Sequence, residues 1–296
     1  MKSEHFRVET LTEGVSATIA DLRGLAVSNS AVVDLGEATL VFDTTFTPRA
    51  AEDLAKAALE LTGRRPTLAA NSHWHLDHML GNSVFSALPI YATRRTREIL
   101  LEKRGELEGE LAPEKLTQDV AEIERLLAAG DPGVSADVLA LNRSLLAEAT
   151  TLRLTPPSHG FEQKFRFPSP RKVELLSWGS GHTDSDAVLH LPDEGIVHAG
   201  DLVLSGVHPS TGSGNPEHWL EVLDAIERLH PERIIPGHGP VTTLEAVGEM
   251  REYLTTVLRI AETHGPYEMP TRYAAWSFRD GFEQTIRFLR GRTAAR

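Results

Sequence analysis

Apolar residues follow two different periods along this chain, and the predicted structure changes where the period changes. Apolar and polar positions alternate through residues 15–43, with Gly24 and Gly36 at turns, which indicates hairpin-like strands. Residues 48–61 show helical spacing, begin with a proline and end before Gly63, so they predict an amphipathic helix. Short apolar runs predict further strands that begin near positions 67, 173, 187 and 196.

Three segments with helical spacing separate the two groups of predicted strands: residues 93–103, 113–129 and 135–149. Helical spacing returns at residues 215–229, where Asn215 is a capping residue and Pro216 takes the first helical position. It continues from about residue 241 to the end of the sequence, with an interruption at Gly265 and Pro266. Two strand-rich halves, each followed by helices, predict an α/β protein in which two sheets pack face to face and helices cover the outside.

Composition excludes several classes of function. The net charge of −12 disfavours nucleic acid as a partner, because affinity for nucleic acid depends on lysine and arginine contacts to phosphate. The sequence has no cysteine, which excludes disulfides, thiolate zinc sites and cysteine nucleophiles. No stretch approaches the ~20 apolar residues of a membrane span, and the N-terminus lacks the apolar core of a signal peptide. We therefore expect a cytoplasmic protein that does not bind membranes.

Four potential metal ligands lie within six positions, directly after the predicted strand at 67–72: His73, His75, Asp77 and His78. On an extended segment His73 and His75 point to the same side, because side chains alternate. Asp77 and His78, where the chain turns into a helix, can reach a second point beside the first. Histidine and carboxylate groups are common zinc ligands, so this arrangement suits two adjacent ions better than one.

Three further potential ligands each stand beside a glycine, at the end of an apolar run: His182, Asp201 and His238. Glycine permits a tight turn and a close approach of the backbone to a ligand. At such positions a loop carries the side chain, and the rigid sheet before it fixes where the loop begins. One histidine beside a glycine would be unremarkable, but three such positions after the first cluster indicate a metal site with seven ligands.

In this order the seven residues resemble the pattern of the metallo-β-lactamase-fold hydrolase superfamily, which is His-x-His-x-Asp-His, then Gly-His, Asp and His. The resemblance extends from about residue 28 to about residue 241. It implies one domain over residues 1–296 with a four-layer αβ/βα sandwich of two mixed sheets. A helical insertion at about 93–155 and C-terminal helices at about 241–296 would be added to that fold. The insertion is expected to wall the active-site cleft or, alternatively, to form the interface of a homodimer.

The resemblance also implies roles for the candidate residues. One ion would be bound by His73, His75 and His182, and the other by Asp77, His78 and His238. Asp201 would bridge the two ions, Asp43 would orient a ligand histidine, and His208 could face the substrate. His159, His190, His198 and His218 are interpreted as core or surface residues.

By the same resemblance, a hydroxide held between two metal ions would attack an ester, thioester, lactone or amide of a small molecule, and Asp77 would carry a proton to the leaving group. Zinc is the expected metal, although iron, manganese, cobalt and nickel accept the same ligands. Asp201 is typical of glyoxalase II-like enzymes and lactonases, and bacterial hydrolases related to SoxH-type proteins look similar. An iron-dependent oxidoreductase such as a sulfur dioxygenase, a β-lactamase-like activity and a non-catalytic scaffold remain alternatives.

Overall fold

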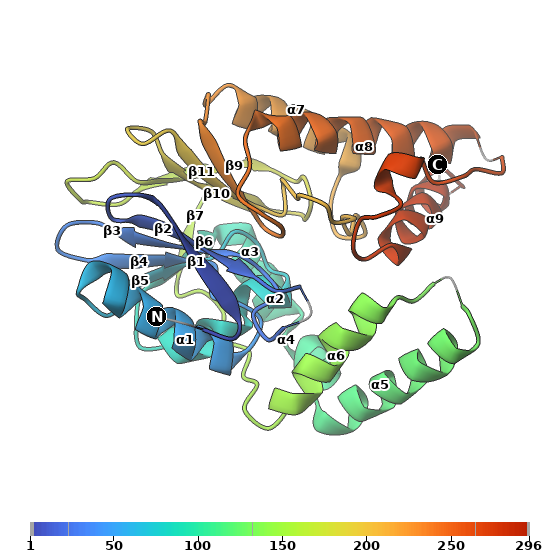
Figure 1. Ribbon diagram of the computed structural model, residues 1–296, viewed down its shortest axis with the longest axis horizontal. Coiled ribbons are helices and arrows are strands. Elements are labelled where there is room, and N and C mark those ends of the chain that lie inside the picture. Colours follow the sequence, from blue (N-terminus) through green and yellow to red (C-terminus); the bar gives the residue numbers. More distant parts are fainter. Residues whose placement is uncertain (1–2, 23, 132, 264, 295–296) are drawn as a thin grey trace.

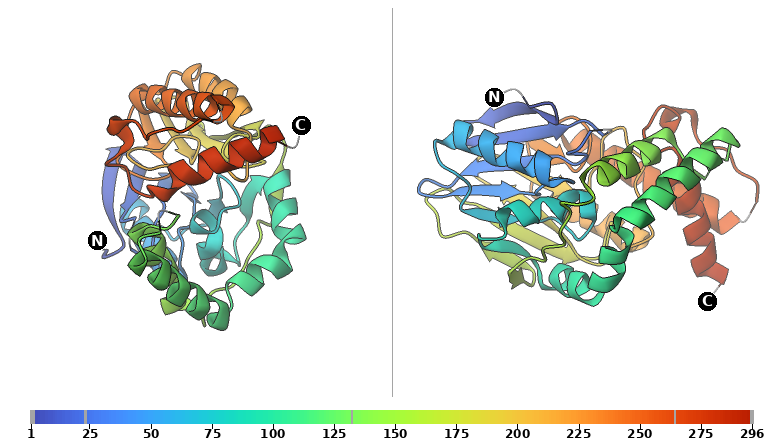
Figure 2. Two further views of the ribbon diagram at one scale, coloured as in Figure 1. Left: turned by 90° about the vertical axis from the view of Figure 1, so that its right-hand side faces the viewer. Right: turned by 90° about the horizontal axis from the view of Figure 1, so that it is seen from below.

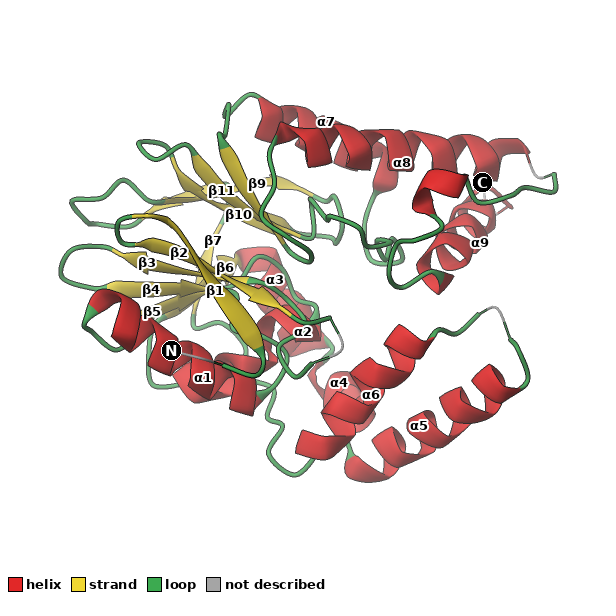
Figure 3. Cartoon of the chain, viewed as in Figure 1, coloured by secondary structure: helices red, strands yellow, loops and turns green. Residues whose placement is uncertain are grey.

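Two stacked sheets form the centre of the molecule in the computed structural model, which describes residues 3–22, 24–131, 133–263 and 265–294 (Figure 1). The ends of the predicted domain, residues 1–2 and 295–296, lie outside the described residues. Helices lie on the outer faces of both sheets, so the four-layer αβ/βα sandwich predicted from the sequence is confirmed (Figure 3).

The first sheet has seven strands among the described residues, and they are hydrogen-bonded in sequence order. They are β1 (Phe6–Thr12), β2 (Val15–Ala20), β3 (Ser30–Asp34), β4 (Thr39–Phe42), β5 (Leu68–Ala70), β6 (Ile90–Thr93) and β7 (His159–Phe161). Strands β1 to β4 pair antiparallel, whereas β4 to β7 pair parallel. The first sheet is therefore mixed.

The second sheet has five strands among the described residues, in the order β12-β11-β10-β9-β8. They are β8 (Lys164–Arg166), β9 (Glu174–Gly179), β10 (Asp186–Leu191), β11 (Ile196–Gly200) and β12 (Arg233–Pro236). The β11–β12 pair is parallel and the other pairs are antiparallel. In each sheet, the strand that comes last in the sequence is therefore parallel to its neighbour. The position of the candidate site depends on parallel pairs in both sheets.

Helices α1 (Pro48–Thr62) and α3 (Arg94–Glu102) pack on the first sheet, and α7 (Pro216–Glu227) packs on the second, in contact with α8 (Leu244–Thr263). Three short helical segments lie within the loops: α2 (Leu76–Met79), η1 (Leu80–Phe85) and η2 (Thr271–Tyr273). The remaining helices are α4 (Arg104–Glu110), α5 (Pro113–Ala128), α6 (Ala136–Glu148) and α9 (Asp280–Ala294). Figure 2 shows α5, α6 and α9 together at one end of the sandwich.

The main core lies between the sheets. Phe42 and Leu40 of the first sheet belong to one apolar cluster with Leu175, Leu189 and Ile235 of the second, and all five are fully buried. Burying each such side chain contributes about 1.5–3 kcal/mol relative to leaving it in water. This apolar contact fixes the two sheets face to face, so the loops at their ends are held in fixed positions.

Local sequence signals explain several helix ends. Thr47 caps α1 by accepting a hydrogen bond from the Ala50 N–H, Pro48 takes the first position, and Gly63 ends the helix with a φ of 73°. Asn215 caps α7 in the same way, through the His218 N–H. The predicted caps at Pro48, Gly63 and Asn215 are therefore confirmed.

Other elements were not predicted. Strands β1 and β6 were not predicted from the sequence. Residues 156–170 contain β7 and β8, two strands of three residues each, which are too short to show alternation of apolar and polar positions. Helix α4 was missed because Gly105 and Gly109 interrupt its helical pattern. Among the described residues, no helix combines the length and the apolar character that a membrane span requires.

Gly81→Ala is expected to destabilise the protein. A Cβ at this position in η1 would lie 1.9 Å from the carbonyl oxygen of Thr44 and 2.7 Å from the Cβ of Ala51, so the backbone would have to move. We expect unfolding in urea to require about 1–3 kcal/mol less than in the parent. Gly248→Ala, in an exposed part of α8 with nothing within 4 Å, is the control and should stabilise by about 0.5–1 kcal/mol. Equal stability of the two variants would contradict this account.

Candidate metal centre

The candidate ligands lie at one edge of the sandwich, where strands from both sheets end. Asp43 follows β4 and His73 comes shortly after β5, which is parallel to β4. Asp201 follows β11 and His238 comes shortly after β12, which is parallel to β11. His182 lies in the loop between β9 and β10. Since parallel strands carry their chain ends to the same edge, the fold places residues from distant parts of the sequence together.

The seven side chains predicted as ligands form two neighbouring groups. Within each group the potential ligand atoms lie within 4.8 Å of one another. One group contains His73, His75, His182 and Asp201, and the other contains Asp77, His78 and His238. We refer to the histidines of the first group as the first triad and to the second group as the second triad. The grouping matches the division expected from the sequence.

Asp201 faces both triads. Its Oδ2 lies 3.3 Å from Nε2 of His182, in the first triad. Its Oδ1 lies 3.1 Å from Nε2 of His78 and 3.4 Å from Nε2 of His238, in the second triad. One carboxylate is thus positioned to provide an oxygen atom to each group. In the second triad, Oδ2 of Asp77 lies 3.3 Å from Nε2 of His78 and 3.1 Å from Nε2 of His238.

Several of these buried atoms have no hydrogen-bond partner. They are Nε2 of His73, Nε2 of His78 and Oδ1 of Asp201, the last two only 3.1 Å apart. In the first triad, by contrast, Nδ1 of His75 and Nε2 of His182 are hydrogen-bonded to each other at 2.9 Å. Buried polar atoms normally have partners, and atoms that converge without bonding one another fit a shared cation. The donor set therefore fits divalent metal ions, with imidazole and carboxylate ligands as zinc prefers.

Asp43 and Ser72 orient two of the histidines. The fully buried Asp43 carboxylate accepts hydrogen bonds from the Ser72 N–H at 2.7 Å and from the Ser72 hydroxyl at 2.8 Å. Its Oδ2 also lies 2.9 Å from Nδ1 of His78, and the Ser72 hydroxyl lies 2.9 Å from Nδ1 of His73. One carboxylate thus fixes His78 directly and His73 through a hydroxyl, which leaves Nε2 of each ring for a metal. The sequence pointed to Asp43 but not to Ser72.

Burial and charge set the protonation of the centre. Burial lowers the pKa of every histidine in the first triad, and that of His182 falls to about 3. Burial acts in the same direction on His238, but the carboxylates of Asp201 and Asp77 outweigh it and raise the pKa of His238 to about 10. The facing histidines hold the pKa of both carboxyls well below the usual range, although burial opposes them. The negative charge that attracts protons to His238 attracts metal cations in the same way.

Residues without a local sequence signal hold the ligand loops. Asn29, fully buried at the start of β3, donates to the backbone carbonyls of Pro236 and Gly239 at 2.8 Å each and so fixes the loop of His238. Asp186 accepts hydrogen bonds from the N–H of Gly181 and from the N–H and hydroxyl of Thr183, and so fixes the loop of His182. Burial raises the pKa of Asp186 to about 7. Only knowledge of the folded chain could identify Asn29.

Gly237 lets the backbone approach the Asp201 side chain closely, as we expected for a glycine beside a candidate ligand. A Cβ at this position would lie 1.9 Å from Oδ1 of Asp201, so a side chain here would displace the carboxylate that faces both triads. The glycine beside His238 is therefore required by the space around Asp201, not only by the turn.

His208 lies near the centre, but both of its ring nitrogens have protein partners. Nε2 lies 3.0 Å from the Tyr273 carbonyl, to which it must donate, so Nδ1 accepts from the Tyr253 hydroxyl at 3.1 Å. Burial lowers the pKa of His208 to about 4, which fits this neutral ring. Any contact with a substrate would be made through its carbon atoms.

The four histidines that the sequence analysis interpreted as core or surface residues are not among the seven candidate ligands. His198 is fully buried in β11, and His190 is nearly buried in β10. His159 is exposed on β7. Nδ1 of His218, on α7, lies 2.6 Å from the carbonyl oxygen of Ser180, to which it can donate.

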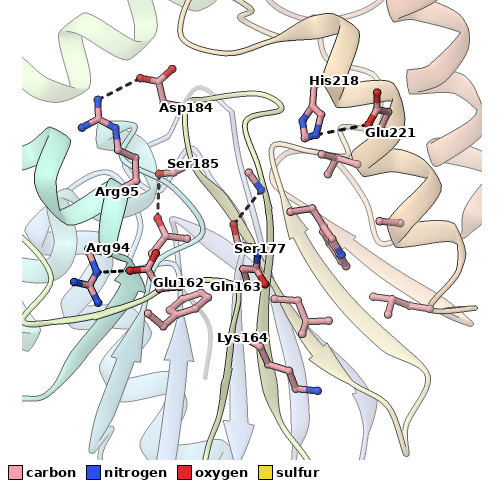
Figure 4. Close-up of a pocket in the computed structure, with 18 of the residues that line it drawn as sticks. Arg94, Arg95, Glu162, Gln163, Lys164, Ser177, Asp184, Ser185, His218 and Glu221 are labelled. Atoms are coloured by element: carbon pink, nitrogen blue, oxygen red, sulfur yellow. Dashed lines mark hydrogen bonds and ion pairs between the residues drawn. The ribbon is translucent and has the colours of Figure 1, made fainter.

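A larger hollow, of about 790 Å³, lies between the edges of the two sheets and α7 (Figure 4). None of the seven candidate ligands lines it, and several of its charged side chains pair with one another. Arg94 pairs with Glu162 at 2.6 Å and Arg95 with Asp184 at 3.7 Å. The chemistry suggested by the ligand set therefore belongs to a smaller cavity beside the two triads, of about 340 Å³.

Together, the sandwich and the seven converging ligands define a metal-binding αβ/βα protein. The sequence matches the metallo-beta-lactamase superfamily over residues 23–238, which is well over half of the chain. The chain belongs to this superfamily, whose members are generally metal-dependent hydrolases.

Solved structures of metallo-beta-lactamases are similar in fold. The crystal structure of DIM-1 metallo-beta-lactamase is 20% identical, with a TM-score of 0.61 over 85% of this chain and 98% of that chain. A metallo-beta-lactamase from Pontibacter korlensis is 15% identical, with a TM-score of 0.62 over 85% and 99%. FIM-1 from Pseudomonas aeruginosa, in its mono-zinc form, is 19% identical, with a TM-score of 0.60 over 86% and 97%. At these identities the likeness establishes the fold alone.

Asp43→Asn is expected to weaken metal binding about 10–100-fold, because the amide has one acceptor oxygen instead of two, so its NH2 group would face either the Ser72 N–H or the Ser72 hydroxyl and His78. Competition with a chromogenic chelator would measure the affinity. Asp34→Asn is the matched control, since Asp34 also ends a strand but pairs with Arg64 at the surface. Unchanged metal affinity in Asp43→Asn, with the fold intact by circular dichroism, would remove Asp43 from this role.

Proposed function

We propose that this protein is a dinuclear metal-dependent hydrolase that cleaves an ester, thioester, lactone or amide bond in a small molecule. The observation that carries the proposal is the position of Asp201, whose two oxygens face different triads at 3.1–3.4 Å. A carboxylate shared in this way suits two ions held side by side. The match to a superfamily of metal-dependent hydrolases supports the same reading.

In this proposal the first triad holds one ion, the second triad holds the other, and Asp201 spans them. When bound, two such ions supply a water that is acidic enough to act as a nucleophile near neutral pH and a Lewis acid for the substrate carbonyl. Zinc is the preferred metal because imidazole dominates the donor set, and iron, manganese, cobalt and nickel suit the same donors. The zinc form of FIM-1, a similar structure, supports zinc.

Asp77 is the proposed catalytic carboxylate. Its side chain is 20% exposed, whereas that of Asp201 is 9% exposed and that of His78 is fully buried. Asp77 also lines the cavity of about 340 Å³ beside the two triads. It can therefore orient a nucleophilic water through one oxygen and transfer a proton to the leaving group.

Elemental analysis should find two equivalents of metal per chain. His182→Ala and His238→Ala should each lower the content toward one equivalent, because each removes a donor from a different triad. A single iron per chain with uptake of oxygen would instead support an iron-dependent oxidoreductase and overturn the hydrolase proposal.

Asp77→Asn should lower kcat about 10²–10⁴-fold on whichever substrate is turned over, because the amide cannot carry the proton. A panel of chromogenic esters, lactones, thioesters and β-lactams provides the assay, and β-lactams test for a β-lactamase-like activity. Asp184→Asn is the control, since this acid is mostly exposed and pairs with Arg95. If the Asp77 variant kept the parent kcat, Asp77 would not be the proton carrier.

A further inference from the structure

The cavity beside the two triads has an apolar wall that comes from parts of the chain far apart in sequence. Val138 and Leu141 belong to α6, Leu204 and Val207 follow β11, and Phe278 precedes α9. Five of the seven candidate ligands line the same cavity. Its volume of about 340 Å³ is at the lower end of the ~300–1,000 Å³ typical of small-molecule sites. A substrate here must therefore be small, and largely apolar beyond the bond that is cleaved.

This wall is held together across the cavity. The Phe278 N–H donates to Oδ2 of Asp137, at the start of α6, at 2.9 Å, and Asp137 is nearly buried. On the other side, His208 binds Tyr253 and Tyr273 and so fastens the loop after β11 to the C-terminal helices. Because its parts are bonded to one another, the apolar wall does not depend on a ligand to assemble.

Outside the candidate metal ligands, the charged side chain that lines the cavity is acidic: it is Asp280, in the first turn of α9. Among the described residues that line the cavity there is no lysine or arginine, and His238 already faces the carboxylates of Asp77 and Asp201. Such a lining offers no lysine or arginine for the carboxylate of a β-lactam or of a glutathione conjugate.

Asp280 itself has an unused hydrogen-bonding atom. The residue is only 6% exposed, and its Oδ2 accepts from the side-chain amide of Gln284 at 2.9 Å. Its Oδ1 is buried and has no partner. A buried carboxylate oxygen without a donor is costly, and a donor supplied by a ligand in the cavity would remove that cost.

We propose that the cavity binds a small aliphatic acyl substrate whose far end carries an amine, and that Asp280 accepts the hydrogen bond of that amine. The inference rests on the proposed hydrolase function and adds the substrate class. A protonated amine provides both the missing donor and the opposite charge. An alkyl chain matches the apolar wall of the cavity that Asp280 and the candidate ligands share, and a terminal carboxylate beside Asp280 would meet it without a lysine or arginine in the lining.

Three 4-nitrophenyl esters of equal chain length test the proposal with the metal-loaded protein: those of hexanoic acid, 6-aminohexanoic acid and adipic acid. After correction for spontaneous reaction, we expect kcat/KM of the amine-ended ester to exceed that of the methyl-ended ester about tenfold or more, with the carboxylate-ended ester poorest. Asp280→Asn should abolish the preference for the amine, so that kcat/KM for the amine-ended ester falls to the value for the methyl-ended ester. Glu283→Gln, in the same turn of α9 but outside this cavity, should retain the preference.

Binding provides a readout that does not depend on turnover. Calorimetry should give a Kd for 6-aminohexanamide at least about tenfold below that for hexanamide, and the difference should disappear in Asp280→Asn. Turnover of all three esters without preference, or equal binding of the two amides, would overturn this inference and leave the hydrolase proposal standing. Binding that prefers the amine, with no metal-dependent turnover of any substrate in the panel, would support the site and overturn the hydrolase proposal.

Discussion

Seven candidate metal-binding side chains, five of them buried, converge in one small volume, and some of their polar atoms find no hydrogen-bond partner there. Nε2 of His78 and Oδ1 of Asp201, for example, lie 3.1 Å apart as an ion pair, but neither atom has a hydrogen-bond partner. Such groups stay in place only if other contacts hold them there. Asp43 provides the most central of these contacts, through Ser72 to one histidine and directly to another, from a backbone with a φ of 57°. A residue held in this uncommon conformation indicates that its surroundings determine its position.

The sandwich provides those surroundings. Each sheet contains a parallel pair whose chain ends reach the same edge, and the apolar core between Phe42 and Ile235 keeps the two edges together. Asn29 then bonds the start of one strand in the first sheet to the loop after β12 in the second. The superfamily match ends at residue 238, whereas Phe278 and Asp280 of the cavity lie beyond it. The candidate metal centre therefore lies within the shared fold, whereas part of the cavity beside it belongs to a segment outside the match.

The sequence predicted an element correctly where its pattern of apolar and polar positions was long and its end signals were local. The helix at Pro48–Thr62 begins with a proline and is followed by a terminal glycine, and both signals were readable in the sequence. It failed for β7 and β8, which have three residues each and are strands only because β6 and β9 lie beside them. It also failed for α4, where two glycines weaken the helical pattern. Short elements take their structure from neighbours that the sequence does not place.

The sequence by itself determined the fold class and the set of seven candidate ligands, because each ligand stands in a recognisable local pattern and their order is that of a known superfamily. Only the tertiary structure decided which residues support them and what surrounds the substrate. Ser72 and Asn29 act through contacts with residues 1 to more than 200 positions away. Asp280 reaches the cavity because α9 packs against α8 and the residue Phe278, just before α9, is bonded to Asp137 of α6. Local patterns encode the type of a side chain and its direction, whereas distances between remote segments arise only when the chain has packed.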